Sequence, residues 1–192
     1  MYNAERLALE LLGLEMIWES HHWKEPLIES AAAFEDFAQH TELSEEDLVK
    51  VEIDVFIGFY SIRKLMDTMT ISDSTKNLKL VLAWHPNVKN VHEWNSHRLD
   101  KLYDFRVTNQ ETRSIRFICN QIIHSFVFAP VENDRGNLEG IVFSSDKDRN
   151  NKLYFMDTKQ LVEVFRLIGN DYPAHLMRER DPNTGEFKTK VW

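Results

Sequence analysis

The segment LVKVEIDVFIGFYSIRKLMDTM, residues 48–69, constrains the fold more than any other part of the chain. Between residues 51 and 62 it is apolar on nearly every face, so other elements of the protein are expected to cover it. Ser44 and Asp47 predict a capped N-terminus just before it. We therefore expect a long central helix, because apolar residues recur at the helical spacings of three and four at positions 48, 51, 55, 59, 62, 66 and 69.

Helical patterns also dominate the rest of the first two thirds of the chain. Leu7, Leu11, Leu14 and Trp18 follow the helical period, and TNQE, residues 108–111, has the form of a capping box. The patterns predict helices over residues 3–20, from Pro26 to 40, over 73–84, over 88–105, and from Thr108 to just before Pro130.

The character of the chain changes after Pro130. LEGIVFS (138–144) and KLYFM (152–156) are short β-rich runs that predict a hairpin. Asp157 and Gln160 predict the start of a last helix, and DPNTGE predicts the turn of a terminal hairpin. We therefore expect a mainly α fold, a bundle of four to six helices with a small C-terminal β-hairpin and helix. The expected single domain, 1–192, divides into a helical bundle over 1–130 and an α+β appendage over 131–192.

Charge and cysteine content exclude some classes of protein. The chain of 192 residues has a formal net charge of −8, which argues against nonspecific coating of nucleic acid. Its single cysteine, Cys119, cannot form an internal disulfide and fits a reducing compartment. No apolar run reaches the roughly 18 residues that a membrane span needs, and the N-terminus lacks the pattern of a secretory signal. The expected location is the cytoplasm, with no membrane contact.

A row of polar residues runs through the helix predicted after Thr108. On a helical wheel, four of these residues fall in an arc of roughly 80°, opposite an apolar seam. We call them the polar row: Arg113, Arg116, Asn120 and His124. Phe117 stands on the same side, which indicates that something covers part of this face.

The polar row has structural and chemical interpretations. It is either the solvated face of an amphipathic helix or a set of groups that tie neighbouring loops through hydrogen bonds. Alternatively, His124 acts as general acid or base, Arg113 and Arg116 bind a scissile phosphate, and Asn120 orients the substrate or the imidazole. Such a set suits metal-independent cleavage of RNA by its own 2′-hydroxyl.

The segment CNQIIHS, residues 119–125, resembles the RNxxxH signature of the HEPN superfamily, helical domains of many prokaryotic toxin, defence and RNA-processing proteins. Asn120 and His124 match the signature, while Cys119 replaces the Arg that precedes the Asn. Arg116, one turn earlier, takes the place of that Arg in this interpretation. The resemblance implies a four- or five-helix bundle, a homodimer that brings two rows together, and ribonuclease activity or RNA binding.

Other functional sites find little support in the sequence. His92 and His97 are five residues apart, about 140° around a helix, so they do not share a metal from one face. With one cysteine and no glycine-rich phosphate loop, we expect neither metal nor cofactor, and the wheel places Cys119 in the core. The acidic charge equally fits a noncatalytic interaction protein, such as an immunity or antitoxin partner or a regulatory subunit. The partners left open are RNA, a second copy of the chain and another protein.

Overall fold

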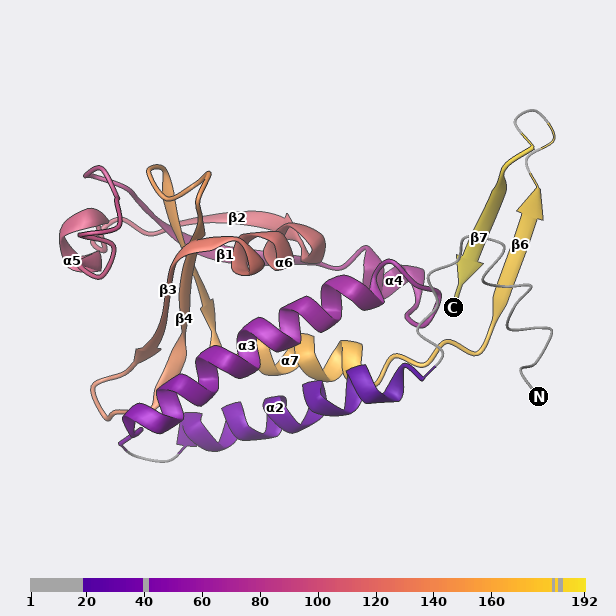
Figure 1. Cartoon of the computed structure of the whole chain (residues 1–192), viewed down its shortest axis with the longest axis horizontal. Coiled ribbons are helices and arrows are strands. Elements are labelled where there is room, and N and C mark those ends of the chain that lie inside the picture. Colours follow the sequence, from indigo (N-terminus) through magenta and orange to yellow (C-terminus); the bar gives the residue numbers. More distant parts are fainter. Residues whose placement is uncertain (1–18, 40–41, 181, 183–184) are drawn as a thin grey trace.

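The architecture is mixed α/β, built on a five-stranded antiparallel sheet (Figure 1). This computed structural model describes residues 19–39, 42–180, 182 and 185–192. The expected mainly α bundle over residues 1–130 is wrong, because three of the five strands begin within that range. The strands of the sheet, in spatial order, are β2 (Asn109–Ser114), β1 (Lys79–Pro86), β5 (Lys152–Asp157), β4 (Leu138–Ser145) and β3 (Ser125–Glu132).

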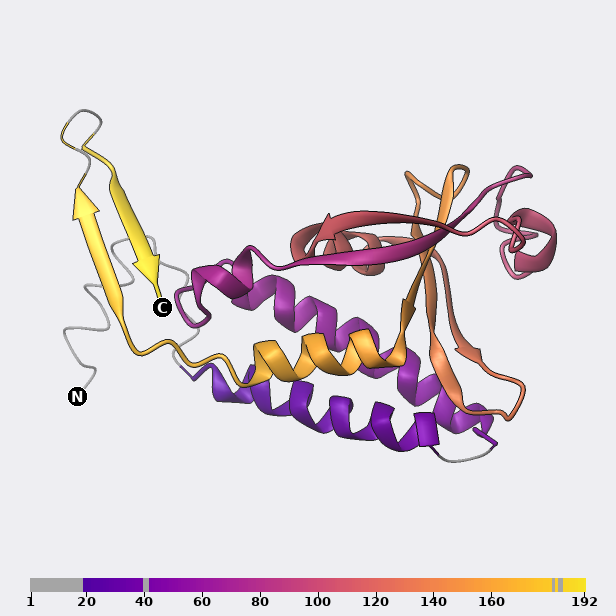
Figure 2. The same ribbon diagram turned by 180° about the vertical axis from the view of Figure 1, so that it is seen from behind.

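Three longer helices form a layer against one face of the sheet, and Figures 1 and 2 show them from opposite sides. They are α2 (His21–Gln39), α3 (Glu45–Leu65) and α7 (Thr158–Gly169). Their buried side chains join those of α6 (Ile115–Ile123) and of the sheet in one core cluster. In both figures α3 and α7 lie on opposite sides of this layer, with α3 nearer the viewer in Figure 1.

The local signals for the two main helix starts are confirmed. Ser44 and Asp47 form the predicted capping box of α3, in which the Ser44 hydroxyl accepts from the Asp47 backbone N–H. Asp157 caps α7 and accepts from the Gln160 backbone N–H at 2.7 Å. Pro26 lies inside α2 and not at its start. The helix expected over residues 3–20 lies outside the described residues, apart from its last two positions.

The helices predicted between residues 73 and 130 are largely wrong, and the last of them ends at Ile123, before β3. α4 is a single turn (Asp73–Lys76), and the chain then enters β1. Every second residue of this strand, Leu80, Leu82 and Trp84, points to the same face of the sheet. The segment 88–105 contains only α5 (Leu99–Leu102). The predicted capping box at 108–111 instead begins β2. These residues follow β-periodicity because β1 pairs with both β2 and β5, a long-range requirement that helical spacing does not reveal.

The loop around α5 covers the second face of the sheet at one end. Val91, Leu102 and Tyr103 pack with Val127, Val142 and Leu153 in a separate apolar cluster. The Tyr103 hydroxyl donates to the Arg149 carbonyl at 2.7 Å. This segment therefore acts as a small second layer, and it is not the helix predicted from sequence.

Both predicted hairpins are confirmed. β4 and β5 pair antiparallel, with Val142 opposite Phe155. β6 (Leu176–Arg180) and β7 (Phe187–Val191) form the terminal hairpin, which stands apart from the rest of the molecule in Figures 1 and 2. Val191 attaches it through a backbone N–H donated to the Asp73 carboxylate at 3.1 Å.

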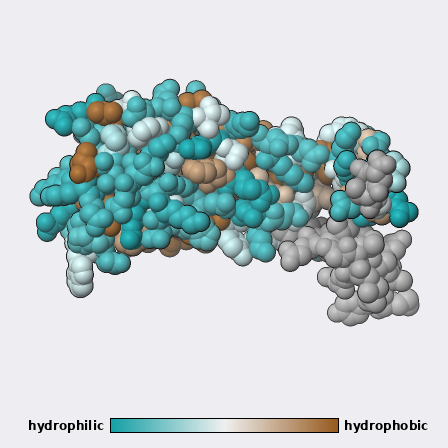
Figure 3. Space-filling model, turned by 90° about the horizontal axis from the view of Figure 1, so that it is seen from above, coloured by the Kyte–Doolittle hydropathy of each residue, from teal (hydrophilic) through white to brown (hydrophobic). Residues whose placement is uncertain are grey.

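The surface seen from above in Figure 3 is mainly hydrophilic, with its apolar residues in small separate patches. Among the helices in the described part of the chain, none is long and apolar enough to cross a membrane.

The helical layer meets at Phe165 of α7. Its ring centroid lies 5.6 Å from that of Phe34 in α2 and 5.4 Å from that of Phe59 in α3. Gly58 faces the same ring, and a Cβ at this position would clash with it. The Phe165 ring therefore packs directly on the backbone of α3 only because residue 58 has no side chain.

We expect Gly58→Ala to lower the free energy of unfolding by roughly 1–3 kcal/mol, because the added methyl group overpacks a filled core. Urea denaturation followed by circular dichroism measures the change. Glu52→Ala, on an exposed position of the same helix, is the control and should change stability little. Equal stability of the two variants would contradict the close contact between the Phe165 ring and Gly58.

Candidate functional site

Three of the four residues of the polar row lie at successive turns of α6. Ser114 caps this helix, and its hydroxyl accepts from the Phe117 backbone N–H at 3.3 Å. Arg116 and Asn120 lie one turn apart, and His124 is the C-cap, with its backbone N–H donated to the Asn120 carbonyl at 3.1 Å. The fourth, Arg113, lies in β2, so its place on the predicted wheel is wrong.

Both arginines of the polar row face a carboxylate. Arg113 donates from Nε to Glu111 at 2.9 Å, and its guanidinium lies 4.6 Å from the centre of the Phe117 ring. Arg116 donates to Asp67 at 3.1 Å. A phosphate at this face would therefore have to compete with Asp67 for Arg116.

Asn120 and His124 are exposed, and neither side chain hydrogen-bonds to another described residue. Their neighbour Cys119 is fully buried in the core, which confirms the packing role predicted for it. Burial raises the pKa of the Cys119 thiol to about 12, so it stays protonated and is no nucleophile. Phe117 packs edge-on against Tyr154 of the same chain, with centroids 5.7 Å apart.

A second polar cluster, which sequence reasoning missed, lies on the helix-covered face of the sheet. We call it the Glu111 cluster. The Glu111 carboxylate accepts from the Tyr154 hydroxyl at 2.6 Å and from the Lys152 ammonium at 2.8 Å, besides Arg113. Lys152 also lies 4.3 Å from the centre of the Trp84 ring. The cluster thus joins the three adjacent strands β2, β1 and β5.

Strand alternation explains how these residues meet. Glu111 of β2 pairs with Leu82 of β1. Tyr154 of β5 pairs with Trp84, which lies two residues further along β1. Residues two apart point to the same face of a strand, so all four side chains share one side of the sheet. The spacing Glu-x-Arg in 111–113 and Lys-x-Tyr in 152–154 was the available signal. The sequence did not show that β1 lies between these segments.

The electrostatics of the Glu111 cluster favour fixed charges. Burial alone would raise the pKa of Glu111, but hydrogen bonds from Lys152, Tyr154 and Arg113 outweigh it and lower the pKa to about 2. Burial and the adjacent carboxylate raise the pKa of Tyr154 above its usual value. The carboxylate therefore stays ionised and the phenol stays protonated near neutral pH. Such a saturated arrangement binds strands together and leaves no obvious free acid or base.

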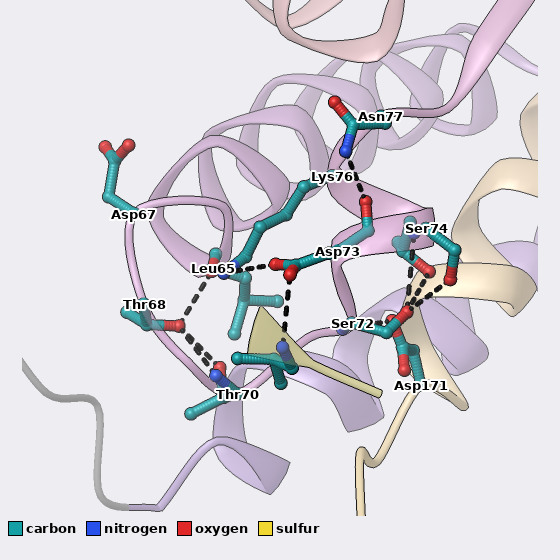
Figure 4. A network of polar contacts seen from close by, with 12 residues as sticks. Leu65, Asp67, Thr68, Thr70, Ser72, Asp73, Ser74, Lys76, Asn77 and Asp171 are labelled. Carbon is teal, nitrogen blue, oxygen red and sulfur yellow. Dashed lines mark hydrogen bonds and ion pairs between the residues drawn. The ribbon is translucent and has the colours of Figure 1, made fainter. Parts of the chain in front are cut away.

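The loop before α4 forms another polar network, shown in Figure 4. Ser72 donates from both its backbone N–H and its hydroxyl to the Asp171 carboxylate, each at 2.8 Å. Lys24, fully buried, donates to the carbonyls of Thr70 at 2.7 Å and Asp171 at 2.5 Å. Burial lowers the pKa of Lys24, and the charge of Asp171 partly offsets this. These contacts tie α2, the loop and the end of α7 together, which is a structural role.

A shallow groove of about 350 Å³ lies between α2 and α7. Arg166 and Glu35 both line this groove and form a bidentate ion pair, in which each guanidinium nitrogen lies 2.5 Å from a carboxylate oxygen. This pair links the two helices across the groove, so it too serves to hold the helical layer together.

In the described part of the chain, no group of three or more His, Cys, Asp or Glu side chains is placed to hold a metal ion. His92 accepts from the Trp94 backbone N–H at 3.3 Å, and His97 accepts from the Arg98 side chain at 3.3 Å. Both rings thus make local contacts within the loop around α5.

We expect Glu111→Gln to lower the free energy of unfolding by about 1–3 kcal/mol at neutral pH, because Lys152 and Arg113 lose a charged partner. The folded-state pKa lies below the ordinary value of 4.5, so the carboxylate stabilises the fold fully above pH 4.5. This contribution is lost as the pH falls toward 2. The stability difference between wild type and variant should therefore shrink over that window in urea titrations. Glu52→Gln should show no such convergence.

Comparisons with known proteins assign no family to this chain. No protein-family model matches it, and no curated protein or solved structure is significantly similar to it. Its function is therefore inferred from the geometry of its own residues.

Proposed function

We propose that this protein is a noncatalytic interaction protein that binds another polypeptide through the outer face of α3. One observation carries the proposal. Four large apolar side chains of α3 are 47–56% exposed, and we call them the α3 stripe: Val49, Ile53, Ile57 and Tyr60.

The α3 stripe is a continuous surface feature. Its members are separated by three or four residues, so they lie along one side of the helix. The side chains of Val55, Phe59 and Ile62 face the core instead. Single exposed apolar residues are common on any protein, whereas several in line on an outer helix face mark an interface. Figure 1 shows α3 at the front of the helical layer.

The electrostatics of the rest of the molecule support binding of protein over catalysis on RNA. Arg113 and Arg116 already face Glu111 and Asp67. The net charge of −8 disfavours a polyanionic partner. An apolar surface on an acidic protein fits a polypeptide partner.

Site-specific photo-crosslinking in living cells tests the proposal. With a photo-reactive phenylalanine analogue in place of Ile57, we expect one discrete crosslinked species to another polypeptide. The same analogue at Val88, a 60% exposed residue of the loop around α5, is the control and should give none. If position 57 yields no discrete species, or if both positions yield the same ones, the α3 stripe is not a binding surface.

RNA cleavage by the polar row is a second candidate function. The observation in its favour is that Asn120 and His124, one and two turns beyond Arg116, are exposed without described side-chain partners. These two residues keep the spacing of the HEPN signature, whereas Cys119 departs from it. Here His124 would act as general acid or base and Arg116 would bind the phosphate.

On this second candidate, His124→Ala should reduce cleavage of single-stranded RNA in EDTA by about 10²- to 10⁴-fold. The folding stability should change little, because the side chain is exposed. His97→Ala, which removes an imidazole from the loop around α5, is the matched control and should cleave like wild type. Intact RNA after incubation with wild-type protein would remove the candidate and leave the interaction protein.

A further inference from the structure

The two ends of the α3 stripe carry opposite charges. Glu46 lies one turn before Val49, and Lys64 lies one turn after Tyr60. They are 18 residues apart, five full turns of helix, so they fall on the same side as the stripe and about 27 Å from each other. Neither forms an ion pair with another described residue, so both charges are available to a partner.

The charges on two copies of α3 are complementary in one relative orientation of the helices only. If two copies of α3 pack antiparallel about a two-fold axis near residue 55, Glu46 faces Lys64 of the second copy at each end. Ile53 then faces Ile57, and Val49 lies near Tyr60. A parallel pair would instead set Glu46 against Glu46 and Lys64 against Lys64, which repels at both ends.

We infer that the occupant of the α3 stripe is the α3 helix of a second copy of this chain, packed antiparallel in a homodimer. The inference rests on the proposed function and names its partner. A two-fold interface presents the same patch from both subunits, so a patch with opposite charges at equal distances from its centre is suited to it. The surface differs from the one expected from sequence, which lay around Phe117 on α6.

The apolar part of the interface is tested by sedimentation of the full-length chain at micromolar concentration. We expect the mass of a dimer for wild type and of a monomer for the Ile53→Lys/Ile57→Lys variant, because the four lysines of a dimer would meet at its centre. Val88→Lys, which places the same charge at an exposed apolar residue elsewhere, should remain dimeric. Circular dichroism checks that all variants fold.

Charge reversal tests the orientation. Glu46→Lys and Lys64→Glu should each raise the dimer dissociation constant roughly tenfold or more, since each places like charges together at both ends. The combined Glu46→Lys/Lys64→Glu variant restores opposite charges and should return to within about threefold of wild type. Only antiparallel pairing predicts this recovery.

Several results would overturn the inference. These are a monomeric wild type, a dimer that survives the Ile53→Lys/Ile57→Lys changes, or a double charge reversal that fails to restore association. A crosslink from position 57 to a different protein would also overturn it, while leaving the proposed function intact. A crosslink to residues 1–18 of the same chain would overturn both.

Discussion

The contact between Phe165 and Gly58 is the constraint on which the helical layer depends. The Phe165 ring fills the space between Phe34 and Phe59, and Gly58 provides room for it. α7 begins where β5 ends, at Asp157, so the ring has a fixed place relative to the sheet. The helices α2 and α3 precede the strands of the sheet in the chain, yet part of the apolar surface that they bury lies against Phe165 of α7, which follows β5. The fold is therefore held together by contacts between its first and last thirds.

Local signals predicted those elements whose ends are determined by neighbouring residues. The capping residues Ser44 and Asp157 each start a helix as expected, because a cap needs only a hydroxyl or carboxylate and the next few backbone N–H groups. The helix predicted over residues 73–84 is wrong for the opposite reason. Its apolar residues fit both the helical and the strand period, and the decision came from distant strands, which pair on both sides of β1.

The same distinction applies to the candidate sites. The sequence predicted that Arg116, Asn120 and His124 lie at successive turns of one helix, and α6 with its C-cap holds them so, although the helix is shorter than predicted. It could not place Arg113, because the preceding residues form β2, where alternation turns Arg113 toward Glu111. The α3 stripe was also hidden in the sequence. The sequence alone does not distinguish an apolar residue that neighbouring elements cover from one that stays exposed, because only the packing of the folded protein determines which it is.

The two arginines of the polar row are held with different strength, and this bears on the choice between binding and catalysis. Arg113 belongs to the Glu111 cluster, whose carboxylate is mostly buried, so its release would leave a poorly solvated charge. Arg116 and Asp67 are both more than 40% exposed, and such surface pairs contribute only about 0–1 kcal/mol. A phosphate could therefore recruit Arg116 alone, which leaves His124 with one cation where two were expected. Binding at the α3 stripe breaks no ion pair, because its four side chains are apolar or phenolic. Of the two candidate functions, it therefore requires the smaller rearrangement of side chains.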